Sequence, residues 1–432
     1  MRRPASSRSA RRASALLVAF GLWWLCALAA WAAPTTGAAD YVVMLADGSD
    51  AAAVAAEHAR AGGARVRSVY RGVGGYAASL TPQQLARIKS DPRVDLVDED
   101  LPVEADAQVL PFGVDRIDAD KSSDHAGSGR GKSVNAAVAI VDTGIDLSHP
   151  DLEAVPGTNC VTPGSSPQDD NGHGTHVAGI VAARDDQSGV VGVAPGARVV
   201  AVKVLDSSGF GRRSQLICGI DWVTRNAAAV GIVAVNMSLS GRGADDHNCG
   251  ATNGDALHRA ICRSIRKTGV TYVVSAGNHG ADLAGFVPAG YGEVLTVTAM
   301  ADTDGARGGL GPPPDCQNGA DDKYARFSNY ASVGSGNEQH TIAAPGVCVL
   351  STWPGGFTHE LSGTSMAAPH VTGTVALCIA NQSCAGLQPA QIVAKLRADA
   401  AARGRSYGFK GDPDHSPPPG QYLGFLVYAG GY

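Results

Sequence analysis

Ser365 is the residue best placed in this 432-residue chain to act as a nucleophile. It stands among small residues in Gly363-Thr364-Ser365-Met366-Ala367, directly before a run with the apolar spacing of a helix. The start of a helix carries free backbone N–H groups, which stabilise an anion that develops beside them. Serine at such a position also commonly caps a helix. A catalytic role therefore requires that the chain also supplies a base and an orienting carboxylate.

Asp142 and His173 are the candidates for those two groups. Asp142 closes the apolar stretch 138–141, and His173 lies between two glycines where a loop enters a helical pattern. A serine hydroxyl needs an imidazole to take its proton, and the imidazole needs a carboxylate to fix its tautomer. Taken alone, Asp142 could be a turn residue. His173 and His176 could be a metal pair, although no helical glutamate accompanies them as in zinc peptidases. With Ser365, they predict peptide or ester hydrolysis through an acyl-enzyme.

Asn278 is a candidate donor for the oxyanion of such a reaction. It follows the apolar stretch 272–274, and a side-chain amide at the end of a buried strand can face the reacting carbonyl. Taken alone, it could be a turn asparagine. An esterase of the α/β-hydrolase kind predicts a Gly-x-Ser-x-Gly elbow and the order serine, acid, histidine. The chain has neither, so we set that alternative aside.

The elements that must position these residues form a repeating pattern. Continuous apolar stretches are typical of parallel strands that are covered on both faces, and helical patterns separate them. We therefore expect a doubly wound α/β domain with its site at the carboxyl ends of the strands. The predicted strands are 138–141, 199–202, 232–235, 272–274 and 294–297, and the helices are 175–183, 213–228 and 255–267. Residues 308–320 and 412–420 read as irregular loops, and 423–427 as a strand-like end.

A smaller domain precedes this one. Strand patterns at 41–45, 66–70, 75–80 and 94–97 are combined with helical patterns at 50–60 and from Pro82 onward. The order is β-α-β-β-α-β, which predicts a ferredoxin-like α+β module.

Residues 1–33 are typical of a secretory signal peptide. Five arginines precede an apolar run that ends in small residues, and the run is short for a membrane span. We therefore predict a secreted protein without a stable membrane anchor. Removal of the five arginines takes the formal net charge from −5 to −10, which disfavours nucleic acid as a partner.

Eight cysteines follow the signal, and no Cys-x-x-Cys pair is present. An even number behind an export signal favours disulfides over free thiols or zinc ligands. Spacing alone does not fix the connectivity. Loop lengths are compatible with Cys249–Cys262 and Cys378–Cys384, and the remaining pairs are guessed as Cys160–Cys218 and Cys316–Cys348.

Four motifs, taken together and in order, resemble those of the subtilases, the subtilisin-like serine peptidases that include proteinase K. They are 141–146 (VDTGID), 173–179 (HGTHVAG), 276–278 (AGN) and 363–370 (GTSMAAPH). The resemblance implies that Asp142, His173 and Ser365 form a catalytic triad. It also implies that Asn278 and the backbone N–H of Ser365 form the oxyanion hole.

The resemblance further implies where a peptide substrate lies. Two exposed strands clasp it in antiparallel pairing, here Ser238-Leu239-Ser240 and Gly209-Phe210-Gly211. The third residue of the first segment is commonly Gly in the family and is Ser240 here. Phe286 would line the base of the first side-chain pocket. We therefore expect a broad endopeptidase with an apolar preference.

The α+β module resembles the inhibitory prodomain of the family, which assists folding and is then removed by its own enzyme. The sequence around Asp106 looks like the family's junction, so we place cleavage after Asp106. The expected organisation is a signal peptide at 1–33, a prodomain at 34–106 and a catalytic domain at 107–432.

A calcium site is implied by the same resemblance. Oxygen ligands from carboxylates, an amide and backbone carbonyls suit Ca²⁺. The implied ligands are the side chains of Gln108, Asp151 and Asp186 and the carbonyls of Arg184, Ser188 and Val190. An acidic loop of this kind could also simply be solvated.

The expected partners are protein and peptide substrates and the chain's own prodomain, and we expect a monomer. The alternative from another functional class is a catalytically idle binding or inhibitor protein on the same fold. The joint presence of Asp142, His173, Asn278 and Ser365 argues against it.

Overall fold

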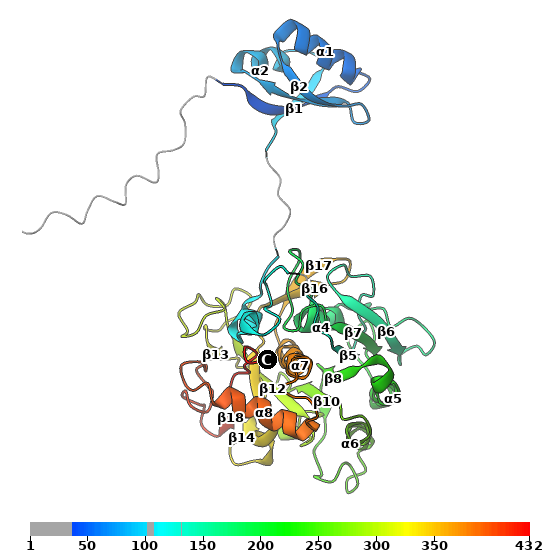
Figure 1. The fold of residues 1–432 in the computed structure, drawn as a ribbon, viewed down its shortest axis with the longest axis vertical. Coiled ribbons are helices and arrows are strands. Elements are labelled where there is room, and N and C mark those ends of the chain that lie inside the picture. The colour runs from blue at the N-terminus through cyan, green and yellow to red at the C-terminus, as the bar shows by residue number, and fades with distance from the viewer. Residues whose placement is uncertain (1–36, 102–107, 131) are drawn as a thin grey trace, which may run out of the picture. The chain divides into compact units, whose positions relative to one another are not determined.

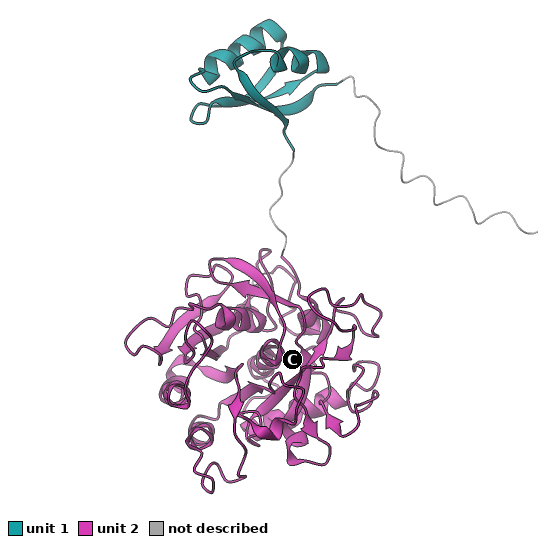
Figure 2. Ribbon diagram, turned by 180° about the vertical axis from the view of Figure 1, so that it is seen from behind, with its two compact units in different colours: residues 1–105 teal, residues 106–432 magenta. Residues whose placement is uncertain are grey.

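The structure is a computed structural model that describes residues 37–101, 108–130 and 132–432 (Figure 1). The predicted signal peptide and the predicted cleavage position lie outside the described residues. The chain forms two compact units, one within residues 1–105 and the other within residues 106–432 (Figure 2). Among the described helices, none combines the length and the apolar character that a bilayer crossing would require.

The smaller unit is a four-stranded antiparallel sheet with two helices, as the sequence predicts. Its strand order is β2-β3-β1-β4. Thr81 and Gln84 form a capping box at the start of the second helix, where Pro82 occupies the first turn. Val43, Tyr76 and other apolar side chains from both layers fill its core. The elements are β1 (Ala39–Leu45), α1 (Ala51–Gly62), β2 (Arg65–Tyr70), β3 (Gly75–Leu80), α2 (Pro82–Lys89) and β4 (Val94–Glu99).

The larger unit is built on an eight-stranded sheet. Its strands run in the order β13-β12-β10-β8-β5-β7-β6, and β15 also pairs with β12. All the pairings are parallel except the antiparallel contact of β12 with β13. The strands are β5 (Ala137–Asp142), β6 (Glu153–Asn159), β7 (Arg198–Lys203), β8 (Ile232–Met237), β10 (Thr271–Ser275), β12 (Leu295–Ala301), β13 (Lys323–Tyr324) and β15 (Thr341–Pro345).

Helices cover both faces of this sheet, which confirms the predicted doubly wound class. The central strand β5 shows why, because its alternate residues belong to two separate cores. Val138 and Ile140 pack in one cluster with α4 (His173–Ala182), α7 (Thr364–Ala380) and α8 (Pro389–Ala401). Ala139 and Val141 pack in the other with α5 (Arg213–Val230) and α6 (Ala256–Thr268).

Several elements depart from the sequence-based expectation. The edge strand β6 escapes prediction because Pro156 and Gly157 interrupt its pattern, and an edge strand tolerates both at its irregular register. The expected strand-like end at 423–427 is wrong. Strand pairing ends just before it, at β18 (Gln421–Tyr422), and the segment itself makes only an isolated bridge between Ala343 and Leu426. The other elements outside the main sheet are α3 (Phe112–Arg116), β9 (Gly241–Arg242), β11 (Phe286–Val287), β14 (Ala331–Ser332), β16 (Val349–Trp353), β17 (Phe357–Leu361) and β18 (Gln421–Tyr422).

All four expected disulfides are present in the structure. They are Cys160–Cys218, Cys249–Cys262, Cys316–Cys348 and Cys378–Cys384. The third ties the irregular loop at 308–320 to the segment just before β16.

Candidate active site

Asp142 and His173 meet at the carboxyl edge of the sheet. Asp142 is the last residue of β5 and is fully buried, and His173 is the first residue of α4. Asp142 Oδ1 lies 2.7 Å from Nδ1 of His173. Because a carboxylate only accepts hydrogen bonds, Nδ1 carries the proton and Nε2 is free to accept one. Burial lowers the pKa of His173 and the Asp142 carboxylate raises it, with a net increase.

Ser365 lies in the first turn of α7 and is tied to the end of β8. Its hydroxyl donates to the carbonyl of Ser238 at 3.3 Å, and the Ser238 hydroxyl donates back to the carbonyl of Ser365 at 2.7 Å. Among the described contacts, the hydroxyl of Ser365 therefore bonds to Ser238 and not to His173. A hydroxyl hydrogen rotates freely, and catalytic hydrogen bonds are often loose before substrate binds.

Asn278 is held against the start of α7. Its Oδ1 accepts hydrogen bonds from the backbone N–H of Thr364 at 2.9 Å and from the Thr364 hydroxyl at 2.8 Å. A Cβ atom placed on Gly363 would lie 3.3 Å from Nδ2 of Asn278 and 3.6 Å from the backbone nitrogen of Ser365. Two N–H donors therefore border one small space, and glycine at 363 keeps that space free of a side chain.

His176 does not share a metal with His173. Its side chain is fully buried, and Nε2 lies 3.0 Å from the carbonyl of Val349 and 2.9 Å from that of His359. Burial lowers the pKa of His176 to about 3. His173 thus belongs to the site, whereas His176 belongs to the core, and the two do not form a metal pair.

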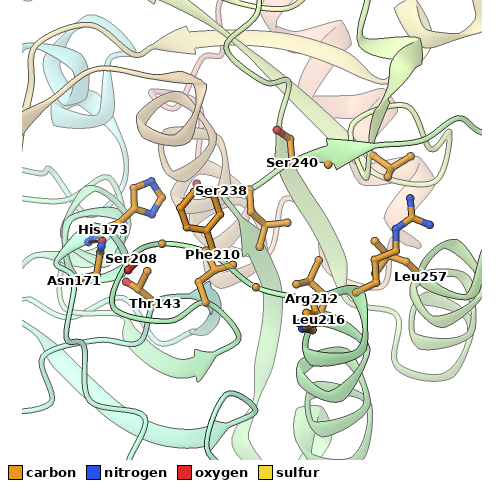
Figure 3. A pocket seen from close by; sticks show the side chains of 17 residues that line it. Thr143, Asn171, His173, Ser208, Phe210, Arg212, Leu216, Ser238, Ser240 and Leu257 are labelled. Carbon is orange, nitrogen blue, oxygen red and sulfur yellow. Dashed lines mark hydrogen bonds between the residues drawn. The ribbon is translucent and has the colours of Figure 1, made fainter.

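A cleft with a volume of about 460 Å³ runs beside His173. Both expected substrate segments line it, namely 209–211 and 238–240. His173 lies at one end of the cleft and Leu257 at the other, with Phe210 and Ser238 between them (Figure 3). Phe210 is 74% exposed, so this wall presents an apolar ring to solvent.

Phe286 lies outside the lining of that cleft, although its neighbour Val287 belongs to it. The Phe286 ring is buried, with the Arg242 guanidinium 4.4 Å from its centroid and the His279 ring 4.6 Å away. The Phe286 ring therefore packs in the interior against a guanidinium and an imidazole and not in the wall of the cleft.

The residues of the expected calcium site come together around one side-chain amide. The amide nitrogen of Gln108 lies 2.7 Å from the carbonyl oxygen of Arg184, 3.3 Å from that of Ser188 and 3.4 Å from that of Val190. A half-turn of the amide exchanges its nitrogen for its oxygen. With the amide turned in this way, four oxygen atoms would face one another. Such a set repels itself when empty and suits a hard cation such as Ca²⁺.

The two acidic residues of the expected site contact the same loop. Asp151 accepts hydrogen bonds from the backbone N–H of Arg184 at 3.1 Å and from that of Val190 at 3.0 Å. Burial raises the pKa of Asp151 to about 7. Asp186 is exposed, and its Oδ1 accepts a hydrogen bond from the hydroxyl of Ser188 at 3.1 Å. A nearby cation would favour the ionised form of the buried carboxylate.

Two supporting residues were missed from the sequence. Asp169 shapes the entry to α4, because its carboxylate accepts hydrogen bonds from Thr143 Oγ1, the backbone of Gly172 and both polar groups of Thr175. Asn329 fixes the segment around Asn278, since its amide bonds to the carbonyl of Ala276 and to the backbone N–H groups of His279 and Ala281. An Asp-Asp-Asn-Gly turn before a helix was a possible signal for Asp169. Asn329 has no such local signal.

A buried aspartate is bonded to a partly exposed histidine at the carboxyl edge of a doubly wound sheet, with a serine at a helix start and a peptide-sized cleft beside them. This arrangement is characteristic of a serine hydrolase.

Comparisons with known proteins narrow this class to one family. The model of the subtilase family matches residues 133–414, and that of peptidase inhibitor I9 matches residues 40–106. Subtilisin E of Bacillus subtilis (strain 168) is 34% identical over 352 residues, with 80% of each chain covered. Subtilisin DY of Bacillus licheniformis is 37% identical over 305 residues, covering 70% of this chain and 95% of the relative.

A solved structure agrees with this assignment. The crystal structure of a cold adapted subtilisin-like serine proteinase has a TM-score of 0.55 and 28% identity, covering 74% of this chain and 98% of the other. The chain belongs to the subtilase family. It is a serine endopeptidase of that family, preceded by an I9-type prodomain.

Proposed function

We propose that Asp142, His173 and Ser365 are the catalytic triad of a secreted, autoprocessed endopeptidase. The observation that carries this assignment is the 2.7 Å contact of Asp142 with His173, because it leaves Nε2 as a base at the mouth of the cleft. The family membership of the chain and the place of Ser365 at the start of α7 support it.

The reaction follows from these roles. Ser365 Oγ attacks the carbonyl carbon of the scissile peptide while His173 Nε2 takes the hydroxyl proton. Collapse of the tetrahedral intermediate breaks the C–N bond, and the same proton passes from Nε2 to the departing amine. Water then repeats the sequence on the acyl-enzyme and frees Ser365. Asp142 remains ionised and stabilises the imidazolium in each half-reaction.

The oxyanion is bound by Asn278 Nδ2 and the backbone N–H of Ser365. Thr364 supports this role because both of its donors engage Asn278 Oδ1, which turns the Nδ2 group the other way. Donors that are already oriented need no rearrangement as charge develops on the carbonyl oxygen.

Substrates are unfolded protein segments and peptides with a broad range of sequences. Residues 209–211 and 238–240 bind the peptide main chain in antiparallel pairing, which tolerates most side chains. Leu239 and Leu257 make the cleft partly apolar. Phe286 is buried behind the cleft lining next to Val287, which lines the cleft, and from there it limits the depth of the first pocket. These features favour apolar side chains without deep-pocket selectivity.

The I9-type unit serves as an inhibitor and folding aid until the enzyme cleaves the chain after Asp106. The protein is secreted after loss of the signal at residues 1–33 and acts as a monomer without a membrane anchor. Its acidic mature chain does not use nucleic acid as a partner.

A calcium ion stabilises the catalytic unit. The side chains of Gln108, Asp151 and Asp186 hold it together with the carbonyls of Arg184, Ser188 and Val190. The convergence of three carbonyl oxygens on the Gln108 amide supports this site. The ion has a structural role and takes no part in hydrolysis.

The test is covalent labelling of the full-length chain with a fluorophosphonate. The wild type is expected to label at Ser365 and to release the prodomain, whereas Ser365→Ala does neither. Ser208→Ala is the matched control, because Ser208 lines the same cleft without a catalytic role. It should label like the wild type.

Two outcomes oppose parts of the proposal. An unlabelled, correctly folded wild type would favour the idle binding protein. A Ser365→Ala chain that still loses the prodomain would assign that cleavage to another protease.

A further inference from the structure

The loop at residues 243–255 joins β9 to α6 beside the substrate cleft. Gly241, before the loop, and Leu257, after it, both line that cleft. The Cys249–Cys262 disulfide fastens the loop to α6. Asp246 organises it further, because its carboxylate accepts hydrogen bonds from four backbone N–H groups of residues 248–253. Although burial acts in the opposite direction, these bonds hold the pKa of Asp246 well below its usual range.

His258 on α6 points into this loop. Its side chain is fully buried, and Nε2 lies 2.8 Å from Oε2 of Glu293. The other ring nitrogen, Nδ1, has no hydrogen-bond partner among the described residues. It lies 3.4 Å from Oδ1 of Asp245 and 3.4 Å from Oδ1 of Asp246. The ring stacks on Tyr291 with centroids 4.0 Å apart and planes at 2°, so its orientation is fixed by packing.

The ring of His258 is in contact with three carboxylates, those of Asp245, Asp246 and Glu293. A short contact with the Glu293 carboxylate places the ring proton on Nε2, which leaves a lone pair on Nδ1. That lone pair faces two carboxylate oxygens. Three carboxylates thus surround one buried imidazole, and such a cluster attracts a positive ion.

The distances favour a cation over a proton. A charge-assisted N–H···O bond measures about 2.7–2.9 Å, which is shorter than either contact of Nδ1. In a tetrahedral site with metal–ligand bonds of about 2.1 Å, neighbouring ligand atoms lie about 3.4 Å apart. The contacts of Nδ1 with Asp245 and Asp246 have that length. All three ligand atoms lie within 4.8 Å of one another.

We propose that Asp245, Asp246 and His258 form a divalent-cation site that holds the loop at 243–255 against α6. An imidazole with two carboxylates suits Zn²⁺ and similar transition metals, whereas Ca²⁺ prefers oxygen ligands alone. Glu293 is the positioning residue, because a carboxylate on the second ring nitrogen of a metal-binding histidine fixes its tautomer and orientation. This site is separate from the proposed calcium site and from the Asp142–His173 pair.

The experiment uses the full-length Ser365→Ala chain without an affinity tag, saturated with Ca²⁺, and titrates it with Co²⁺ as the probe. We expect one equivalent of Co²⁺ to bind with visible d–d absorption, and Zn²⁺ to displace it. His258→Gln and Asp245→Asn should each abolish this equivalent. Glu293→Gln should weaken binding by about 10- to 100-fold while the loop stays folded.

His247→Gln is the matched control. His247 belongs to the same loop, but its side chain is 80% exposed and its Nδ1 contacts the other oxygen of Asp245. It should leave the stoichiometry unchanged. A parent chain that binds no Co²⁺ or Zn²⁺, with His258 doubly protonated by NMR at neutral pH, would overturn the proposal. Undiminished binding by a folded His258→Gln variant would do the same, because it would place the metal elsewhere.

Discussion

Asp142 Oδ1 lies 2.7 Å from Nδ1 of His173, and the carboxylate is fully buried whereas the imidazole side chain is 26% exposed. The acid is thus withdrawn from solvent while the base reaches the cleft. In the proposed mechanism the two residues therefore have different roles, because the buried carboxylate orients the ring and raises its pKa, whereas only the ring can contact a substrate.

The pH dependence of turnover should report on this contact. His173 acts as a base only when neutral, so kcat/KM should rise with pH through the pKa of His173, above its ordinary value of about 6.5. Asp142→Asn removes the group that raises this pKa. The acid limb should therefore move to lower pH, and kcat should fall by about 10⁴-fold. Asp304→Asn, at an exposed position, is the control, and an unmoved limb in Asp142→Asn would contradict the assignment.

Asn278→Ala should lower kcat by about 10²- to 10³-fold and change KM little, because the lost donor acts mainly on the transition state. Steady-state kinetics, normalised by active-site titration, measure this effect. Asn381→Ala, at the end of α7, serves as the control. A fall in substrate affinity with normal turnover would argue that Asn278 binds the ground state instead.

Thr364 should matter through Asn278, because its hydroxyl bonds to Oδ1 of that amide at 2.8 Å. Thr364→Val removes the hydroxyl at similar volume and should lower kcat by less than Asn278→Ala does. Thr364→Ser keeps the hydroxyl and should retain most of the activity. If Asn278→Ala is made first, Thr364→Val should cost little more, and additive losses would show that Thr364 acts independently.

Most of the correct predictions of the fold and of the candidate site came from local sequence patterns. Asp142 and Asn278 follow continuous apolar strands, so their place at the carboxyl edge of a parallel sheet could be deduced from the chain itself. Ser365 is preceded by glycine and followed by a helical pattern, and the structure places it in the first turn of α7. Edge strands were harder to predict. In β6, Pro156 and Gly157 interrupt the alternation of apolar and polar residues that would have indicated a strand.

Contacts between distant segments were not predictable. Asn329 supports the Asn278 segment from fifty residues away in the chain, and no local sequence pattern predicts this contact. The cluster around His258 also depends on contacts between separate segments and was not predicted. Its two aspartates and its histidine lie on a loop and a helix, and they converge only because the loop folds back and a disulfide closes it.

Removal of calcium should destabilise the protein. With the ion at a hundred times its Kd, binding contributes about 2.7 kcal/mol to the free energy of unfolding. Chelator should therefore lower the Tm of the Ser365→Ala chain and have little effect on the Tm of the same chain carrying Asp151→Asn. Differential scanning calorimetry of the Ser365→Ala chain measures this without autolysis. Asp399→Asn, outside the site, should keep the full response, and a Tm of the Ser365→Ala chain that chelator leaves unchanged would refute the calcium site.

Phe286 should limit the size of the first side-chain pocket. Its ring is buried and packs against Arg242 and His279, so Phe286→Ala leaves a cavity next to Val287, which lines the cleft. We expect cleavage to shift toward large aromatic residues before the scissile bond, at a stability cost of about 3–5 kcal/mol. A peptide-library profile of the mature enzyme measures the shift. Phe112→Ala, at an exposed ring on α3, should leave the profile unchanged. A wild-type profile that demands a basic residue, or a Phe286→Ala profile identical to it, would place the pocket elsewhere.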